Sequence, residues 1–207
     1  MREIYGDFYA HEYLFGRRAK DISGNILLVV GPSGSGKSSI SSILNKMPQY
    51  EIIRNYTTRY KRSDDRSGHF SYISEDRYES MIKNNDFMLF CEKERGMYGY
   101  LVEDIFRVIN KGSIGILMFR NTGAKALLDL HSHIKTVFIT ANPADSAKHS
   151  REEKNKPSTS KNRDVLLKNQ ELFDKAEKKL VIENTFSGVS EMFTICNSIH
   201  EFVNNDM

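Results

Sequence analysis

One stretch, Gly31-Pro32-Ser33-Gly34-Ser35-Gly36-Lys37-Ser38, constrains the fold of this chain more than any other. It follows the apolar run Ile26–Val30 and precedes a segment whose apolar residues have helical spacing. It therefore matches G-x-x-x-x-G-K-[ST] between a strand and a helix, the context in which the motif has meaning. Glycines let successive backbone N–H groups turn toward an anion, and the helix N-terminus adds partial positive charge. The stretch predicts a phosphate-binding loop.

The side chains of this loop suit a nucleotide with a metal ion. Lys37 can reach the β- and γ-phosphates, and the Ser38 hydroxyl can be a ligand of Mg²⁺. An accidental lysine in a Gly/Ser-rich turn is the disfavoured alternative. The predicted nucleotide-binding residues are Gly31, Ser33, Gly34, Ser35, Gly36, Lys37, Ser38 and Ser39.

Apolar periodicity along the rest of the chain predicts an α/β fold with a parallel sheet and right-handed crossovers. Strands are expected at about 25–30, Ile114–Phe119, 134–140 and Leu180–Ile182, and helices from about Lys37, at 101–110, at 122–131 and at the C-terminus through about Phe202. The predicted class is a three-layer fold with a parallel sheet, built on the phosphate-binding loop.

Two regions depart from this alternation. Residues 51–100 carry short extended pieces, a helix near 75–84 and a tight turn at Gly96–Gly99, which predict the small lobe. Residues 1–24 are polar and aromatic and end at a Ser-Gly pair, so they are expected to form an N-terminal extension. An ordered packing arm and a dimer contact both remain open for it, and residues 25–207 are expected to form the phosphate-binding domain.

A basic segment is the candidate lid, at about residues 145–168. From Lys148 to Lys168 it carries seven Lys or Arg against three acids and contains Pro157-Ser158-Thr159-Ser160. A solvated charged face is one interpretation. In a phosphate-handling protein, such a flap can instead close over transferring phosphates and expel water. Arg151 and Arg163 are then the candidate catalytic residues, because a guanidinium can hold two phosphate oxygens.

The composition of the chain limits which classes of binding partner are expected. The formal net charge of +3 is too mild to indicate nucleic-acid binding, and a small polyanion explains it equally well. We expect a small-molecule phosphate acceptor, no nucleic acid and no membrane. The only two cysteines, Cys91 and Cys196, match no metal-ligand spacing, and the start lacks the apolar core of a signal peptide. A cytoplasmic protein with reduced thiols is expected.

Four motifs in order resemble the guanylate kinase family from about Asn25 to the C-terminal helix: Gly31–Ser38, Thr57-Thr58-Arg59-x-x-Arg62, Gly96-Met97-Tyr98-Gly99 and Val181-Ile182-Glu183-Asn184. The resemblance implies a P-loop kinase domain over residues 25–207, with an acceptor-binding lobe at about 51–100 and a basic lid at about 145–168. It implies transfer of the γ-phosphoryl group of ATP to GMP. It implies that Arg59, Arg62 and Tyr98 hold the acceptor phosphate and that Asn184 lies near the adenine. Two arginines and a phenol also suit a dianion on chemical grounds.

The chain departs from the family pattern where the acceptor base is read. Phe70 stands where the family has a second phosphate-binding Tyr, Leu89 aligns with the Glu that reads guanine, and Met118-Phe119-Arg120 replaces an acidic D-x-D. Asn55 aligns with a base-reading Ser and could still hydrogen-bond. A guanine with unpaired donors would lose roughly 1–3 kcal/mol per partner, which makes GMP or dGMP specificity doubtful.

The acceptor therefore remains open in the sequence. The alternatives are a kinase of a sugar phosphate such as ribose 1,5-bisphosphate, with Arg120 facing a second anionic group, or a nucleotide-binding interaction module with little turnover. The candidate acceptor-binding residues are Asn55, Arg59, Arg62, Phe70, Tyr98 and Arg120.

Overall fold

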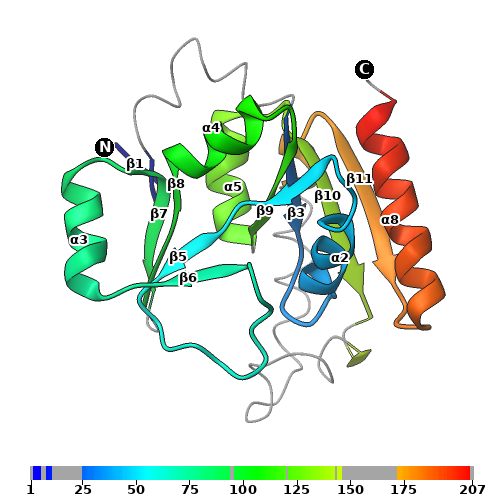
Figure 1. The fold of residues 1–207 in the computed structure, drawn as a ribbon. Helices are drawn as coiled ribbons and strands as arrows, with labels where there is room; N and C mark the ends of the chain where they lie inside the picture. The colour runs from blue at the N-terminus through cyan, green and yellow to red at the C-terminus, as the bar shows by residue number, and fades with distance from the viewer. Residues whose placement is uncertain are drawn as a thin grey trace. The chain divides into compact units, whose positions relative to one another are not determined.

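The computed structural model describes residues 2–5, 8–10, 25–93, 96–119, 121–142, 144–145 and 172–205. Its strands are β1 (Arg2–Tyr5), β2 (Phe8–Ala10), β3 (Ile26–Val30), β4 (Tyr50–Ile52), β5 (Asn55–Thr57), β6 (Phe70–Tyr72), β7 (Phe87–Lys93), β8 (Gly96–Leu101), β9 (Ile114–Phe119), β10 (Lys135–Ala141) and β11 (Lys179–Asn184). Its helices are α2 (Lys37–Leu44), α3 (Glu75–Lys83), α4 (Val102–Asn110), α5 (Asn121–Leu130) and α8 (Val189–Asn204). Figure 1 shows these elements along the chain.

The chain divides into two compact units, each with its own packing. Unit 1 comprises Met1–Ile26 and Pro48–Leu117, and unit 2 comprises Leu27–Met47 and Met118–Met207. The lobe predicted at residues 51–100 falls within unit 1.

A five-stranded sheet with the order β11-β10-β3-β9-β4 carries the phosphate-binding loop. The pairs β10–β11, β10–β3 and β4–β9 are parallel. All five residues of β3 are buried, as an unbroken apolar run in a parallel strand predicts. Within unit 2, α8 packs against both α2 and β11, and the three elements lie side by side in Figure 1.

Unit 1 contains a six-stranded sheet with the order β1-β2-β7-β8-β5-β6. Strand β2 pairs antiparallel with β7, so Ala10 is opposite Leu89 and Phe8 is opposite Cys91. The N-terminal extension is thus part of this sheet, through β1 and β2.

Helix α3 covers one face of the six-stranded sheet. Tyr78 of α3 packs with Phe87 and Leu101 in a buried cluster, and Tyr56 and Phe90 border it. The Tyr78 and Phe87 rings lie 4.4 Å apart between centroids. Ser74 caps the helix by accepting a hydrogen bond from the Arg77 N–H. The predicted helix near 75–84 is confirmed.

The predicted α/β class with a parallel sheet is confirmed, and one local prediction is wrong. The Gly96–Gly99 segment is no tight turn but the start of β8, which pairs antiparallel with β7 and with β5. Its two glycines lower its apparent strand propensity, but the ladders on both sides satisfy its backbone groups.

Candidate active site

The phosphate-binding loop connects β3 to α2, as predicted, and its glycines are required by the surrounding structure. A Cβ on Gly31 would lie 2.3 Å from the carbonyl oxygen of Ile139 on β10. Gly36 has φ of +94°, and a Cβ there would lie 2.4 Å from Nδ2 of Asn184. Gly34 also has positive φ, at 81°. The loop is therefore a backbone cradle of the shape that phosphate binding needs, and the residues present fit a nucleotide.

Two polar side chains of the loop, Lys37 and Ser38, have predicted roles toward a nucleotide and its metal ion. The Lys37 ammonium donates to the carbonyl oxygens of Gly31 at 2.6 Å and Pro32 at 2.5 Å. Its positive charge is therefore held against the loop itself. Ser38 is half-buried in the first turn of α2. It is the residue of this loop that would hold Mg²⁺, because its hydroxyl is a hard oxygen ligand.

Asn184, at the end of β11, is joined directly to this loop. Its side chain is fully buried, its Nδ2 donates to the Ser35 carbonyl at 3.0 Å, and its Oδ1 accepts from the Phe186 N–H at 3.1 Å. The next turn is held by Glu191, whose carboxylate accepts from the N–H groups of Thr185 and Ser187. Both ends of the Asn184 amide thus bind backbone, and its place near the adenine, implied by the family resemblance, stays a prediction.

The acceptor candidates lie in unit 1 and share one face of its sheet. Residues directly opposite in a ladder point to the same face. The pairs Thr57–Tyr98, Thr57–Tyr72 and Asn55–Phe70 therefore place these side chains together. Tyr56 and Phe90 belong to the opposite face, which α3 covers. We call the face that carries Asn55, Thr57, Phe70, Tyr72 and Tyr98 the Tyr98 face. The acceptor residues of β5, β6 and β8 all lie on it.

Arg59, between β5 and β6, is buried and makes a two-pronged ion pair with Asp65. Its Nη1 donates to Oδ2 at 2.7 Å and its Nη2 to Oδ1 at 2.8 Å. The two side chains are only 6% and 2% exposed. The guanidinium also lies over the Phe70 ring, with its Cζ 4.5 Å from the ring centroid. Sequence reasoning predicted Arg59 at the acceptor phosphate, and the structure adds a carboxylate beside it.

The Asp65 carboxylate has two further donors. The Tyr72 hydroxyl donates to Oδ2 at 2.6 Å and the Arg62 backbone N–H donates to the same atom at 2.8 Å. Burial alone would raise the pKa of Asp65, but the hydrogen bonds from Arg59, Tyr72 and the Arg62 N–H outweigh it and lower this pKa far below its ordinary value. The pair is therefore fully ionised at neutral pH.

The pKa values of the two side chains bonded to Asp65 are raised, in contrast to its own. Burial, with the adjacent carboxylate, raises the pKa of Tyr72 to about 12. Hydrogen bonding to Asp65 raises the pKa of Arg59 despite its burial, and the nearby Tyr72 and Tyr98 contribute. The Arg59 guanidinium lies over the Phe70 ring, and Phe70 and Tyr98 belong to the same sheet face, so these three predicted acceptor residues lie in one region of unit 1.

Asp65 and Tyr72 were missed from the sequence, although both had a signal. Asp65 follows Arg62 by three residues in a turn. Tyr72 is two positions beyond Phe70, so the alternation of a strand places both rings on one face. Only the folded loop shows that the two side chains meet.

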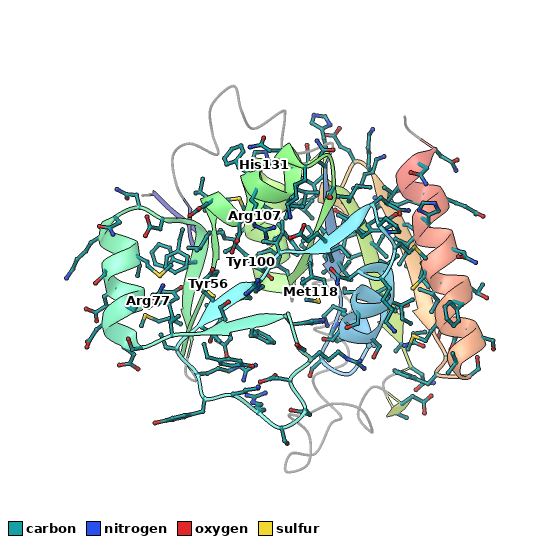
Figure 2. All side chains as sticks on the ribbon, in the orientation of Figure 1. Tyr56, Arg77, Tyr100, Arg107, Met118 and His131 are labelled. Carbon is teal, nitrogen blue, oxygen red and sulfur yellow. The ribbon has the colours of Figure 1, made fainter. Side chains whose placement is uncertain are left out.

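Leu89 aligns with the family residue that reads the guanine base, and its position in the structure differs from that role. Leu89 pairs with Tyr100, the residue labelled in Figure 2, and both belong to the Tyr98 face. However, Leu89 is 1% exposed and Tyr100 is 2% exposed, so neither offers an open surface to a base. The sequence argument against guanine placed Leu89 against the acceptor base, and the burial of this side chain does not support that placement.

Asn55 retains a polar atom for recognition. Its Oδ1 is buried and has no hydrogen-bond partner among the described residues. A buried acceptor without a donor costs free energy that a bound ligand can recover. Three predicted residues, Arg120, Arg151 and Arg163, lie outside the described residues, as does the lid beyond Asp145.

Comparison with known proteins identifies the family signal along most of the chain. The guanylate kinase family model matches residues 23–203. A guanylate kinase from Mycoplasmopsis pulmonis is 37% identical over 123 residues, covering 56% of this chain and 63% of that protein. The match thus spans less than two thirds of that relative. A guanylate kinase from Mesomycoplasma hyopneumoniae is 28% identical over 170 residues, which is 78% of this chain and 83% of that protein.

A solved structure supports the fold. The crystal structure of guanylate kinase from Anaplasma phagocytophilum superposes with a TM-score of 0.61 over 88% of each chain, at 16% identity. The family resemblance predicted from the sequence motifs is confirmed by the family match, and this structural likeness confirms the fold class.

Proposed function

Because this chain belongs to the guanylate kinase family, we propose that it is an ATP-dependent phosphotransferase whose acceptor is a nucleoside monophosphate, with GMP the expected one. The observation that carries this proposal is that two phosphate-binding sets are intact in one chain. One is the Gly31–Ser38 cradle with Lys37, and the other is the Arg59, Arg62 and Tyr98 set. A binding module that had lost turnover would not need both.

On the donor side, the loop backbone holds the phosphates of ATP. Lys37 exchanges its bonds to the Gly31 and Pro32 carbonyls for bonds to the β- and γ-phosphates. Ser38 would hold Mg²⁺, which when bound neutralises charge on these phosphates. Asn184 fixes the loop through the Ser35 carbonyl and lies near the adenine, as the family resemblance implies. Arg151 and Arg163 remain proposed lid residues that add positive charge to the transferring group.

On the acceptor side, the proposed work of the protein is binding and orientation. Arg59, Arg62 and Tyr98 hold the phosphate of the monophosphate, and Phe70 keeps the Arg59 guanidinium in plane. Asn55 accepts a hydrogen bond from the base through Oδ1. Phosphoryl transfer needs positioning and charge neutralisation more than a general base, so these roles are sufficient chemistry for the protein side chains.

The sugar-phosphate and interaction-module alternatives gain no support from the comparisons, whose reported members are guanylate kinases. The burial of Leu89 also removes the main argument for them. Both cysteines are buried thiols outside any disulfide, which supports the proposed cytoplasmic location. Among the helices of the described ranges, none has the length and apolar character needed to span a bilayer.

The test is a coupled assay of ADP release with ATP and a panel of acceptors: GMP, dGMP, AMP, CMP, UMP and ribose 1,5-bisphosphate. We expect turnover with GMP above all others and loss of at least about 10²-fold in kcat in Lys37→Ala. Asn55→Ala should lower kcat/KM for GMP by about tenfold, the cost of one hydrogen bond to a base, with ATP KM unchanged. No turnover with any acceptor would refute the enzyme proposal, and preference for the bisphosphate would restore the sugar alternative.

A further inference from the structure

We propose that Asp65 and Tyr72 are positioning residues for the acceptor phosphate: the Asp65 carboxylate, oriented by the Tyr72 hydroxyl, fixes the Arg59 guanidinium so that its remaining N–H donors face the phosphate. The inference rests on the proposed function, because it assigns the network to the monophosphate that Arg59 binds. It follows from the hydrogen bonds of a single side chain.

The Arg59 guanidinium has five N–H donors, and the structure shows how three of them are used. Both hydrogens of Nη1 are engaged, one with Asp65 Oδ2 at 2.7 Å and one with the Tyr60 carbonyl at 2.9 Å. One hydrogen of Nη2 binds Asp65 Oδ1 at 2.8 Å. The Nε–H and the second Nη2–H are not used by these bonds. They point in parallel from one edge of the guanidinium, the geometry that binds two oxygens of a phosphate.

The orientation of that edge is fixed from two directions. The carboxylate of Asp65 sets the rotation of the guanidinium within its plane. The ring of Phe70, 4.5 Å from Cζ, sets the plane itself. Tyr72 adds a second ring at 5.5 Å. A pre-oriented fork loses less conformational entropy on binding than a free arginine, so it binds the same phosphate more tightly.

Asp65 also makes the burial of Arg59 possible. A guanidinium that is 6% exposed would be a buried charge without compensation if the carboxylate were missing. With Asp65 present, the Arg59–Asp65 pair is neutral overall, and Arg62, whose backbone N–H binds Asp65, is the residue that adds a positive charge for the dianion. The pair therefore sets the orientation of the N–H donors, and the net electrostatic attraction of the phosphate comes from neighbouring positive charge.

Tyr72 acts through this pair and is not itself a phosphate ligand. Its hydroxyl donates to Asp65 Oδ2 at 2.6 Å, so its single O–H is engaged by the carboxylate. Phe70, on the same sheet face, has no hydroxyl to offer. The phenol that residue 70 lacks is thus present two positions later, where it serves the carboxylate that holds the arginine.

The decisive variant is Tyr72→Phe, because it removes one hydroxyl and keeps the ring. We expect GMP affinity, measured by calorimetry without ATP and as KM in the coupled assay, to fall by about tenfold, the cost of weakening one charge-assisted bond. ATP KM and thermal stability should stay close to wild type. Tyr60→Phe is the matched control: that side chain is 95% exposed, and only the backbone carbonyl of Tyr60 takes part. It should change neither affinity.

A double-mutant cycle separates positioning from direct contact. In an Arg59→Lys background the fork is gone, so Tyr72→Phe should lose most of its effect on GMP affinity, giving clear non-additivity. Additive effects would mean that Tyr72 touches the phosphate itself and would overturn the inference. So would an unchanged GMP affinity in Tyr72→Phe, or an equal loss of GMP and ATP affinity. These results leave the proposed function intact, since that function fails only if the wild type turns over no acceptor.

Discussion

The side-chain amide of Asn184 donates to the carbonyl oxygen of Ser35 at 3.0 Å, which joins the end of β11 to the phosphate-binding loop. Both residues are fully buried, so water cannot replace this bond. The same amide occupies the space into which a side chain at Gly36 would grow. The loop glycine and the distant asparagine are therefore one structural unit.

Asn184→Ala should weaken ATP binding, because it removes a hydrogen bond that holds the phosphate-binding loop. The Ser35 carbonyl would be left buried without this donor, which costs about 1–3 kcal/mol of folding free energy. We expect a raised ATP KM with an unchanged GMP KM, and a lower free energy of unfolding in urea. An unchanged ATP KM together with lost stability would show that the bond serves the fold alone.

Gly36→Ala provides the companion test. Its Cβ would lie 2.4 Å from Asn184 Nδ2, at a backbone φ of +94° that costs roughly 1–2 kcal/mol for a residue with a side chain. In the double variant with Asn184→Ala the steric clash disappears. The double variant should therefore be more stable than the sum of the two single losses predicts, by more than about 0.5 kcal/mol. Strict additivity would refute the contact.

The pH dependence of the free energy of unfolding in acid should report on the Arg59–Asp65 ion pair. Its folded-state pKa lies below the ordinary value of 3.8, so its contribution to stability is complete above that value and is lost as the pH falls through the folded pKa. Asp65→Asn should cost about 3–5 kcal/mol at pH 7, because it leaves Arg59 a buried charge without an anion. The gap between wild type and variant should close progressively below about pH 4.

Urea unfolding at neutral pH and at several acid pH values measures this gap. Glu79→Gln on α3 is a suitable control, since Glu79 is exposed and its substitution should shift stability by less than about 0.5 kcal/mol. A gap between wild type and Asp65→Asn that stays constant down to the most acid pH would contradict the assignment of the lowered pKa to Asp65.

The parts of the structure that were predictable are those with local causes. The strand, loop and helix around Gly31–Ser38 follow from an apolar run, glycines at special positions and a periodic segment, and α2 begins at Lys37 as expected. Strand β8 was missed because its backbone bonds go to β7 and β5, partners that no local propensity describes. The strands at the N-terminus were missed for the same reason.

The candidate site shows the same division. Arg59 and Tyr98 were found because their motif spacing resembles a family. Asp65 was not found, because its role depends on a turn that brings its carboxylate to the Arg59 guanidinium. The exposure of Leu89 depends on what covers a strand face, which no alignment of one sequence reveals.

Gly99→Ala tests the packing of β8 against α3. The added methyl would lie 2.6 Å from a Phe87 ring carbon and 2.9 Å from the Tyr78 hydroxyl, both in a buried cluster. Overpacking of this kind costs about 1–3 kcal/mol. Phe87→Leu should recover part of the loss by making room. Gly112→Ala has no atom within 4 Å of its Cβ and only backbone strain, so Phe87→Leu should add to it without any rescue. Urea unfolding of the six proteins decides the point.

The Cys196 thiol should react only slowly with alkylating reagents in the folded protein. It is fully buried on α8, and burial raises the pKa of its thiol to about 11. At pH 8 its thiolate fraction is about a thousandth, roughly a hundredfold below that of an ordinary thiol. A Cys91→Ser variant leaves Cys196 as the only cysteine. We expect its alkylation in native buffer to be more than about a hundredfold slower than in denaturing urea at the same pH. Equal rates in the two buffers would place Cys196 on the surface and contradict the packing of α8 on α2.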